Sequence, residues 1–164
     1  MWKVGDMVRC GADGVCKIED RQILTLMPGV KKEYFILKPV YSEGTTVYME
    51  IQDAQNRFRA PLTKDEADAM IDAIPESERR LDGPDHDAVQ VGSLLRDGDL
   101  ESLMGEVSIL YQRGVQRRKQ GKDHRAADIQ NLRRAETAIN RELAYSLGIR
   151  PEEVSGYIKK RLGK

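Results

Sequence analysis

The 164-residue chain is poor in aromatic residues and cysteine, and it contains no long hydrophobic run. Aromatic side chains make up 5% of the residues and charged side chains 33%, so we expect modest cores beneath a heavily hydrated surface. A membrane-spanning helix needs about 18 consecutive apolar residues. Because no such run occurs, neither a spanning helix nor a signal peptide is expected. These absences predict a soluble, cytoplasmic protein.

Cysteine is limited to Cys10 and Cys16, whose spacing fits no zinc motif. The sequence has no Cys-x-x-Cys pair or neighbouring histidine pair to complete a ligand set. Both cysteines fall in apolar segments with the composition of β-strands, which favours reduced thiols within a core. We therefore predict no metal site and no cofactor.

The motifs of common enzyme classes are also missing. The sequence has no phosphate-binding loop, no Gly-x-Gly-x-x-Gly after a strand and no Gly-x-Ser-x-Gly elbow. Its two histidines, His86 and His124, lie in polar segments where exposure to solvent is expected. Without a buried general base, acid–base catalysis is difficult to assemble, and we do not expect an enzyme.

The first residues have the pattern of β-structure. The opening segment Trp2–Cys10 contains a Val-Gly-Asp turn, with which small SH3-like or Tudor-like barrels often begin. Strand formers follow, separated by turns at Met27-Pro28-Gly29 and Ser42-Glu43-Gly44. They predict strands at residues 2–10, 15–26, 33–41 and 46–51, with a short fifth strand at 57–60. Consecutive short strands favour an antiparallel barrel, a fold that more often binds a partner than performs chemistry.

After Pro61 the hydrophobic period becomes helical. Thr63 and Glu66 have capping-box spacing, and Pro75 limits the helix that they begin. Residues 75–87 are highly charged and contain prolines, which indicates a linker. Further helices are expected at 89–95, after a cap at Asp99, after a cap at Asp123 and after Pro151. The helix after Asp123 is expected to end at Gly148.

The apolar faces of these helices follow the same spacing. They comprise Leu100, Leu103, Met104, Val107, Leu110 and Tyr111 on one helix, Ile129, Leu132, Ile139 and Leu143 on the next, and Val154, Ile158 and Leu162 on the last. The prediction is an α+β protein with a β-barrel over residues 1–62. A connecting helix and linker follow over 63–87, and an α-helical bundle over 88–164.

The 27 basic and 27 acidic residues balance to a net charge of zero, but they are unevenly distributed. Between Thr63 and Glu106 there are 4 basic and 13 acidic residues, a net charge of −9. Between Arg113 and Arg134 there are 8 basic and 2 acidic residues, a net charge of +6. A solvated helix face would explain this basic stretch, but concentrated positive charge can also attract a polyanion.

The arginines of the basic stretch recur at helical spacing, which places several of them near one another. Arginine can bind phosphate groups in a bidentate manner, so the stretch predicts salt-sensitive contacts with a nucleic-acid backbone. The candidate residues are Arg113, Arg117, Arg118, Lys119, Lys122 and Arg125. No segment has the character of a helix that reads base edges, so we expect binding without sequence specificity.

Taken together, the two halves resemble the CarD/CdnL family of bacterial transcription regulators over nearly the whole chain. In the first half the resemblance rests on Lys3-Val4-Gly5-Asp6-x-Val8, on Gly14-Val15, on Lys32 to Lys38 and on Thr46 to Met49. In the second half it rests on Asp97-Gly98-Asp99, on Arg141 to Ala144 and on the helical spacing around them. The order and spacing of these pieces together carry the resemblance.

This resemblance implies a Tudor-like N-terminal domain that binds the β subunit of RNA polymerase, largely by pairing a strand edge with the polymerase. It also implies a helical C-terminal domain that contacts promoter DNA near the upstream edge of the melted bubble and stabilises the open complex. By position, Thr46, Val47, Tyr48 and Met49 lie on the polymerase-facing strand, and Arg21 corresponds to a contacting arginine. We expect a monomer.

One departure concerns a tryptophan that family members usually carry at the start of the helical domain, where it wedges against DNA at the bubble edge. Here the only tryptophan is Trp2, and the corresponding residues 79–89 offer Leu81 among several acidic side chains. The resemblance therefore implies polymerase binding more directly than it implies stabilisation of the bubble.

Two alternatives belong to other functional classes. An RNA- or ribosome-binding protein could have an SH3-like barrel, but it would need stacking aromatics beside the basic stretch. Tyr111 and Tyr145 lie nearby, at helical spacings that suit a core better. A non-nucleic-acid adaptor would use its helical bundle to dock another protein, with the charges serving only solvation.

Overall fold

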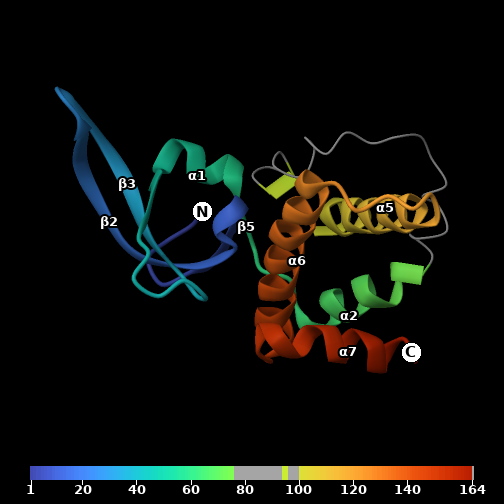
Figure 1. The fold of residues 1–164 in the computed structure, drawn as a ribbon. Coiled ribbons are helices and arrows are strands. Elements are labelled where there is room, and N and C mark those ends of the chain that lie inside the picture. Colours follow the sequence, from blue (N-terminus) through green and yellow to red (C-terminus); the bar gives the residue numbers. More distant parts are fainter. Residues whose placement is uncertain (76–93, 96–99, 164) are drawn as a thin grey trace. The chain divides into compact units, whose positions relative to one another are not determined.

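A computed structural model describes residues 1–75, 94–95 and 100–163 of the chain (Figure 1). The chain divides into two compact units, Met1–Pro61 and Leu62–Lys164. Strands dominate the first unit and helices the second, so the predicted α+β class is confirmed. Within the described residues, no helix has the length and apolar character that crossing a membrane requires.

The first unit is built on a five-stranded antiparallel sheet. Its strands are β1 (Met7–Cys10), β2 (Val15–Met27), β3 (Val30–Pro39), β4 (Val47–Glu50) and β5 (Phe58–Arg59). They are ordered β4-β3-β2-β1-β5, and each neighbouring pair is antiparallel. Over the part of the chain described, β4 and β5 do not pair with each other, so the sheet is not closed. The antiparallel strands are as predicted, whereas the closed barrel is not observed.

β1 begins at Met7, later than the strand predicted from residue 2, because a turn occupies the preceding residues. The Asp6 carboxylate accepts a hydrogen bond from the Lys3 N–H at 2.9 Å, and Gly5 has a φ of 96° that favours glycine. The β2–β3 hairpin reverses at Pro28-Gly29, which was expected to form a turn. The residues of these two turns thus explain where β1 begins and where β2 ends.

A short helix, α1 (Ile51–Arg57), follows β4 directly, and the strand pattern does not predict it. The strand expected over 46–51 therefore ends at Glu50. Ala54 is fully buried and Ile51 packs against the sheet core, so this helix covers part of that core. A seven-residue helix without a side-chain cap carries little sequence signal, which explains the omission.

The core of the first unit consists mainly of alternate residues of the strands. Its buried members are Val8, Cys10, Cys16, Ile18, Phe35, Leu37, Met49, Ala54 and Phe58. The two cysteines are unbridged and buried, as predicted. Burial raises the pKa of the Cys10 thiol to about 11 and that of the Cys16 thiol to about 12. Both therefore remain protonated, unreactive thiols at neutral pH.

The second unit consists of helices gathered around α6 (Figure 1). Its elements are α2 (Lys64–Asp72), α5 (Leu100–Lys119), α6 (Ala126–Leu147), the 3-10 helix η2 (Pro151–Glu153) and α7 (Val154–Arg161). α6 contacts α2, α5 and α7, and α2 also contacts α7. The helix that was expected to connect two domains therefore packs within the helical unit.

Two predicted helix boundaries are confirmed, and one is wrong. Thr63 Oγ1 accepts a hydrogen bond from the Glu66 N–H, and the Glu66 carboxylate accepts one from the Thr63 N–H, both at 3.2 Å. Gly148 ends α6 with a φ of 69° in the left-handed region. Asp123 does not cap α6, because the helix begins after Arg125, which occupies the N-cap position without a side-chain hydrogen bond.

The predicted apolar faces of the helices are correct at most positions. The buried members include Leu100, Leu103, Leu110, Ile139, Leu143 and Val154. Tyr111 and Ile129 are exposed instead, because they lie at the margins of the stripe along which the helices meet. The linker, the cap at Asp99 and Leu81 fall outside the described residues, as does most of the helix at 89–95.

Candidate functional site

The first candidate surface is the outer edge of β4. Among the described residues, β4 pairs with β3 alone, from Tyr34 opposite Glu50 to Leu37 opposite Val47. The other side of β4 therefore presents main-chain N–H and C=O groups that no described strand uses. An edge of this kind is a template for the addition of another strand.

The side chains of this edge alternate between two faces of the sheet. Met49 belongs to the buried core and Val47 packs against it, so neither presents its side chain to a partner. Tyr48 points to the other face and is 49% exposed. The Thr46 hydroxyl accepts a hydrogen bond from Lys38 Nζ at 2.6 Å. Tyr48 is thus the residue of this predicted set whose side chain a partner can contact most fully, whereas the Met49 side chain lies in the core.

Arg21 lies on β2 in the same cross-strand row as Phe35 and Met49. Its guanidinium carbon lies 6.0 Å from the centre of the Phe35 ring, and its Nε donates a hydrogen bond to Glu33. That hydrogen bond holds the pKa of Glu33 below its usual value. Because the row containing Arg21 alternates with the row containing Tyr48, the two side chains leave the sheet on opposite faces. The structure therefore does not bring all the predicted polymerase-binding side chains together.

The second candidate surface is the basic stretch at the end of α5. Arg113 is largely buried, and its guanidinium forms an ion pair with the buried Asp128 at 3.3 Å. This pair joins α5 to α6. A charge committed in this way is not available to a phosphate, so the prediction of Arg113 as a DNA contact is not supported by its position.

Arg117 also has a structural contact, because its Nε donates a hydrogen bond to the main-chain oxygen of Asp123 at 2.7 Å. The imidazole of His124 packs over Gly114 of α5, where an added Cβ would lie 2.6 Å from Nδ1 and closer still to Cε1 and Nε2. The segment between α5 and α6 is therefore held against α5 at two points. His124 was expected to be exposed and is instead partly buried.

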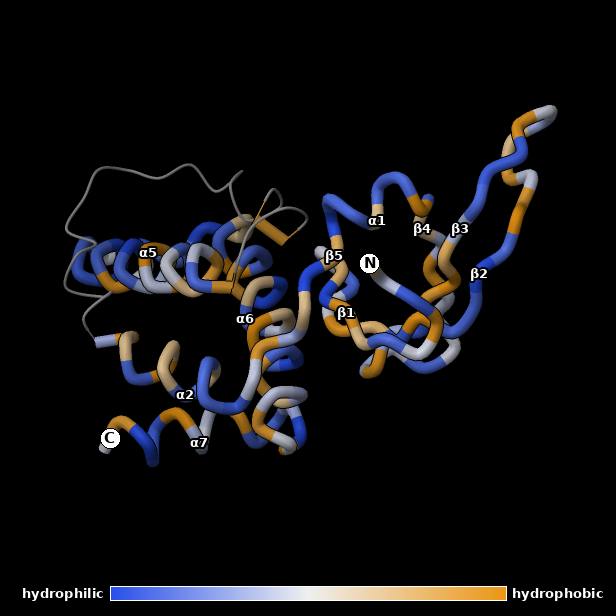
Figure 2. Tube along the Cα trace, turned by 180° about the vertical axis from the view of Figure 1, so that it is seen from behind, coloured by the Kyte–Doolittle hydropathy of each residue, from blue (hydrophilic) through white to orange (hydrophobic). Residues whose placement is uncertain are grey.

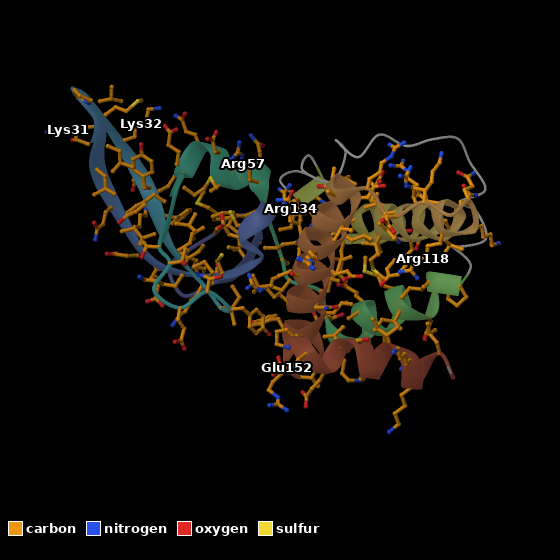
Figure 3. The ribbon with its side chains drawn as sticks, viewed as in Figure 1. Lys31, Lys32, Arg57, Arg118, Arg134 and Glu152 are labelled. Carbon is orange, nitrogen blue, oxygen red and sulfur yellow. The ribbon has the colours of Figure 1, made fainter. Side chains whose placement is uncertain are left out.

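The remaining members of the predicted set are solvent-exposed. They are Arg118 and Lys119 on the last turn of α5, and Lys122 and Arg125 on the segment that follows. We call these four residues the basic loop. Arg133 and Arg134 are exposed on α6, but Figure 3 shows Arg134 well separated from Arg118, which lies at the end of α5 remote from α6. The positive charge is thus concentrated on the basic loop, while Arg113 and Arg117 hold the loop in place.

A polar cluster between α2 and α7 was not predicted. Tyr157 OH donates a hydrogen bond of 2.5 Å to Asp68, which also receives one from Lys64 Nζ at 3.1 Å. Arg161 binds Asp72 through two nitrogens, at 2.8 and 2.9 Å. The hydrogen bond from Tyr157, followed by that from Lys64, holds the pKa of Asp68 below its usual value. Tyr157 and Arg161 are far in sequence from the carboxylates that they bind, so no local pattern could identify these two contacts.

Over the described part of the chain, no group of three or more His, Cys, Asp or Glu side chains is arranged to hold a metal ion. No protein-family model matches the chain, and no curated protein matches it. The function must therefore be argued from the two surfaces described above.

Proposed function

We propose that the protein is a transcription regulator of the CarD/CdnL type that binds the β subunit of RNA polymerase through the β4 edge. Its basic loop contacts promoter DNA and so modulates the stability of the open complex. The observation that carries this proposal is the position of β4 at the edge of the sheet, with Tyr48 exposed beside main-chain groups that no described strand uses.

Strand addition at β4 would supply main-chain hydrogen bonds, and Tyr48 would supply selectivity through its ring and hydroxyl. The short antiparallel strands and the added helix α1 are compatible with a Tudor-like unit. The sheet core beneath β4 holds the edge rigid, because Val47 and Met49 anchor alternate positions of the strand. A partner strand would therefore meet a preorganised edge, which reduces the entropy cost of binding.

The contact with DNA rests on the charge and exposure of the basic loop. Arg118, Lys119, Lys122 and Arg125 can approach phosphates without breaking any ion pair that the structure shows for them. Such contacts are independent of base sequence and weaken as salt rises. The polymerase would supply the choice of promoter, and the loop would add affinity for the DNA that the polymerase holds.

Binding to the lobe region of a bacterial RNA polymerase β subunit tests the proposal, with isothermal titration calorimetry as the measurement. We expect Tyr48→Glu to weaken binding tenfold or more, about 1.4 kcal/mol, because it removes the aromatic contact and adds a charge at the edge. Tyr48→Phe should retain most of the affinity. Gln52→Glu adds the same charge at an exposed position of α1 and should have little effect.

An absence of binding by the unaltered protein would contradict the polymerase half of the proposal. Equal losses for Tyr48→Glu and Gln52→Glu would place the contact elsewhere on the first unit. If the protein preferred RNA to duplex DNA of equal length, the alternative of an RNA- or ribosome-binding protein would replace the proposal.

A further inference from the structure

Two exposed apolar side chains lie on α5 shortly before the basic loop. Tyr111 belongs to the predicted apolar face of this helix, yet it is 54% exposed, and Val115 is 51% exposed. Figure 2 shows hydrophobic and hydrophilic residues alternating along α5, and the buried residues of the helix include Leu103 and Leu110. Tyr111 and Val115 therefore face outward from the helix rather than into the core.

These two side chains lead directly into the positive charge of the basic loop. Val115 follows Tyr111 by four residues and Arg118 follows Val115 by three, so the three side chains share one side of α5. We call these three residues the α5 row. Lys119 comes next on the last turn of the helix, and Lys122 lies on the segment that follows. An aromatic ring, an aliphatic side chain and a guanidinium thus lie in sequence along one helix, beside further exposed lysines.

The hydroxyl end of Tyr111 is held by α6. The negative charge of Glu136 raises the pKa of Tyr111, and partial burial and a hydrogen bond between the two side chains act in the same direction. The phenol is therefore neutral at neutral pH. Because its oxygen is engaged with Glu136, the exposed surface of Tyr111 is largely that of the ring. A ring fixed at one end loses little conformational freedom when a flat group stacks on it.

We propose that the α5 row binds an unpaired DNA strand, with one base stacked on the ring of Tyr111 and neighbouring phosphates bound by Arg118 and Lys122. Proteins that bind single strands combine positive charge along the backbone with aromatic side chains on which bases stack. At 1.5 Å per residue, Arg118 lies about 10 Å along the helix from Tyr111, within the span of a few nucleotides. Duplex DNA keeps its bases stacked on one another, so it can use the charges but not the ring.

The size and charge of this surface favour a single strand over a protein partner. Tyr111 and Val115 are the only exposed large apolar side chains among the residues of α5. At the same helical spacing they are bounded by the polar Ser108 and Arg118. A partner helix would need apolar anchors over two or more turns, which this pair does not offer. The adjoining charge is positive and complements phosphates.

This inference rests on the proposed function, because the open complex is the source of the unpaired strand. It deepens that function by assigning one form of DNA to the α5 row. The binding itself is a property of the chain alone, so it can be measured without polymerase.

Fluorescence anisotropy of the full chain with labelled oligothymidine tests the proposal. We expect Tyr111→Ala to weaken this binding about tenfold and to leave binding of duplex DNA of equal length unchanged. Tyr111→Phe keeps the ring and should retain most of the affinity. Tyr48→Ala removes an exposed tyrosine from the first unit, so it is the matched control and should bind like the unaltered protein. Circular dichroism checks that the variants fold.

An abasic strand of the same length separates stacking from charge, because it keeps the phosphates and lacks the bases. The unaltered protein should bind it about tenfold more weakly than oligothymidine, whereas Tyr111→Ala should not distinguish the two strands. The salt dependence of log K for oligothymidine should be the same in Tyr111→Ala as in the unaltered protein, because the substitution removes no charge.

The proposal would be overturned if the unaltered protein bound the abasic strand as well as oligothymidine, or failed to bind either. Equal losses on oligothymidine and duplex DNA in Tyr111→Ala would also overturn it. Tighter binding of oligouridine than of oligothymidine would assign the α5 row to RNA instead. Failure of the proposed function is a separate result, because Arg118→Glu with Lys122→Glu tests its DNA contact on duplex DNA and Tyr48→Glu tests its polymerase contact.

Discussion

Gly114 shows how one absent side chain shapes the basic loop. The His124 ring occupies the space where a Cβ of residue 114 would lie, and Arg117 fixes the adjacent Asp123 carbonyl. These contacts hold the segment between α5 and α6 against α5, so that the chain runs back along this helix before α6 begins. Within the described residues His124 Nδ1 is buried without a hydrogen-bond partner, so the ring is retained there by packing rather than by a polar contact.

We predict that Gly114→Ala destabilises the protein although alanine favours helices. The added methyl must displace His124 and detach the loop, which should lower the free energy of unfolding by about 1–3 kcal/mol. Gly105 lies on the same helix with no described atom within 4 Å of an added Cβ. Gly105→Ala should therefore stabilise the protein by about 0.5–1 kcal/mol. Urea unfolding followed by circular dichroism measures both changes, and stabilisation by Gly114→Ala would show that the ring is free to move.

At the level of elements, α2 is held at its start by Thr63 and along its length by α7. The capping box satisfies main-chain N–H groups that the first turn of a helix would otherwise leave unbonded. Tyr157 and Arg161 then bind Asp68 and Asp72 on the adjoining turns. The first attachment is local and the second joins segments far apart in sequence.

Thr63→Ala should lower the free energy of unfolding by about 0.5–2 kcal/mol, because the N–H of Glu66 loses its hydrogen-bond acceptor. Thermal unfolding measures the effect. Thr45→Ala is the control, since Thr45 is an exposed turn residue whose hydroxyl forms no hydrogen bond with the residues that the structure describes. Equal changes in the two variants would mean that the cap contributes nothing specific.

The contact between α2 and α7 should make stability depend on acidity. The pKa of Asp68 is lowered in the folded protein, chiefly by Tyr157. The ionised Asp68 therefore stabilises the fold at neutral pH, and this contribution is lost as the pH falls through the folded pKa, below the usual value of 3.8.

Tyr157→Phe tests this contribution. We expect the variant to have a lower Tm than the unaltered protein at neutral pH, and we expect the difference to shrink on acidification. Tyr145→Phe, in the same unit, should show no such trend. Scanning calorimetry from neutral pH to about pH 3 follows both, and a difference independent of pH would assign the effect of Tyr157 to packing alone.

At the scale of the whole molecule, the zero net charge conceals the basic loop, which we propose as the surface that binds DNA. We expect Arg118→Glu with Lys122→Glu to weaken association with duplex DNA. The salt dependence of log K should become flatter by about 0.9 for each phosphate that the variant no longer neutralises. Lys159→Glu with Lys160→Glu on α7 changes the net charge equally and is the control. Fluorescence anisotropy measures both, and equal weakening in the two double variants would mean that the basic loop is not a specific surface.

Much of this architecture is predictable because its causes are local. The capping box at Thr63, the left-handed Gly148 and the turn at Pro28-Gly29 are each recognised from a few adjacent residues. The sites are predicted less well, because a candidate residue's role depends on its neighbours. Arg113 belongs to the basic stretch of the sequence, but in the structure its guanidinium forms an ion pair with Asp128.

The sequence by itself determined the α+β class, the positions of most strands and helices, the buried thiols and the presence of a basic stretch, because hydrophobic period, turn chemistry and charge act over short distances. Only the tertiary structure decided that β4 lies at an edge, that Met49 faces inward while Tyr48 faces outward, and that the β2–β3 hairpin projects uncovered. These features depend on strand order and on which elements end first. Both are settled by long-range packing, which no local pattern records.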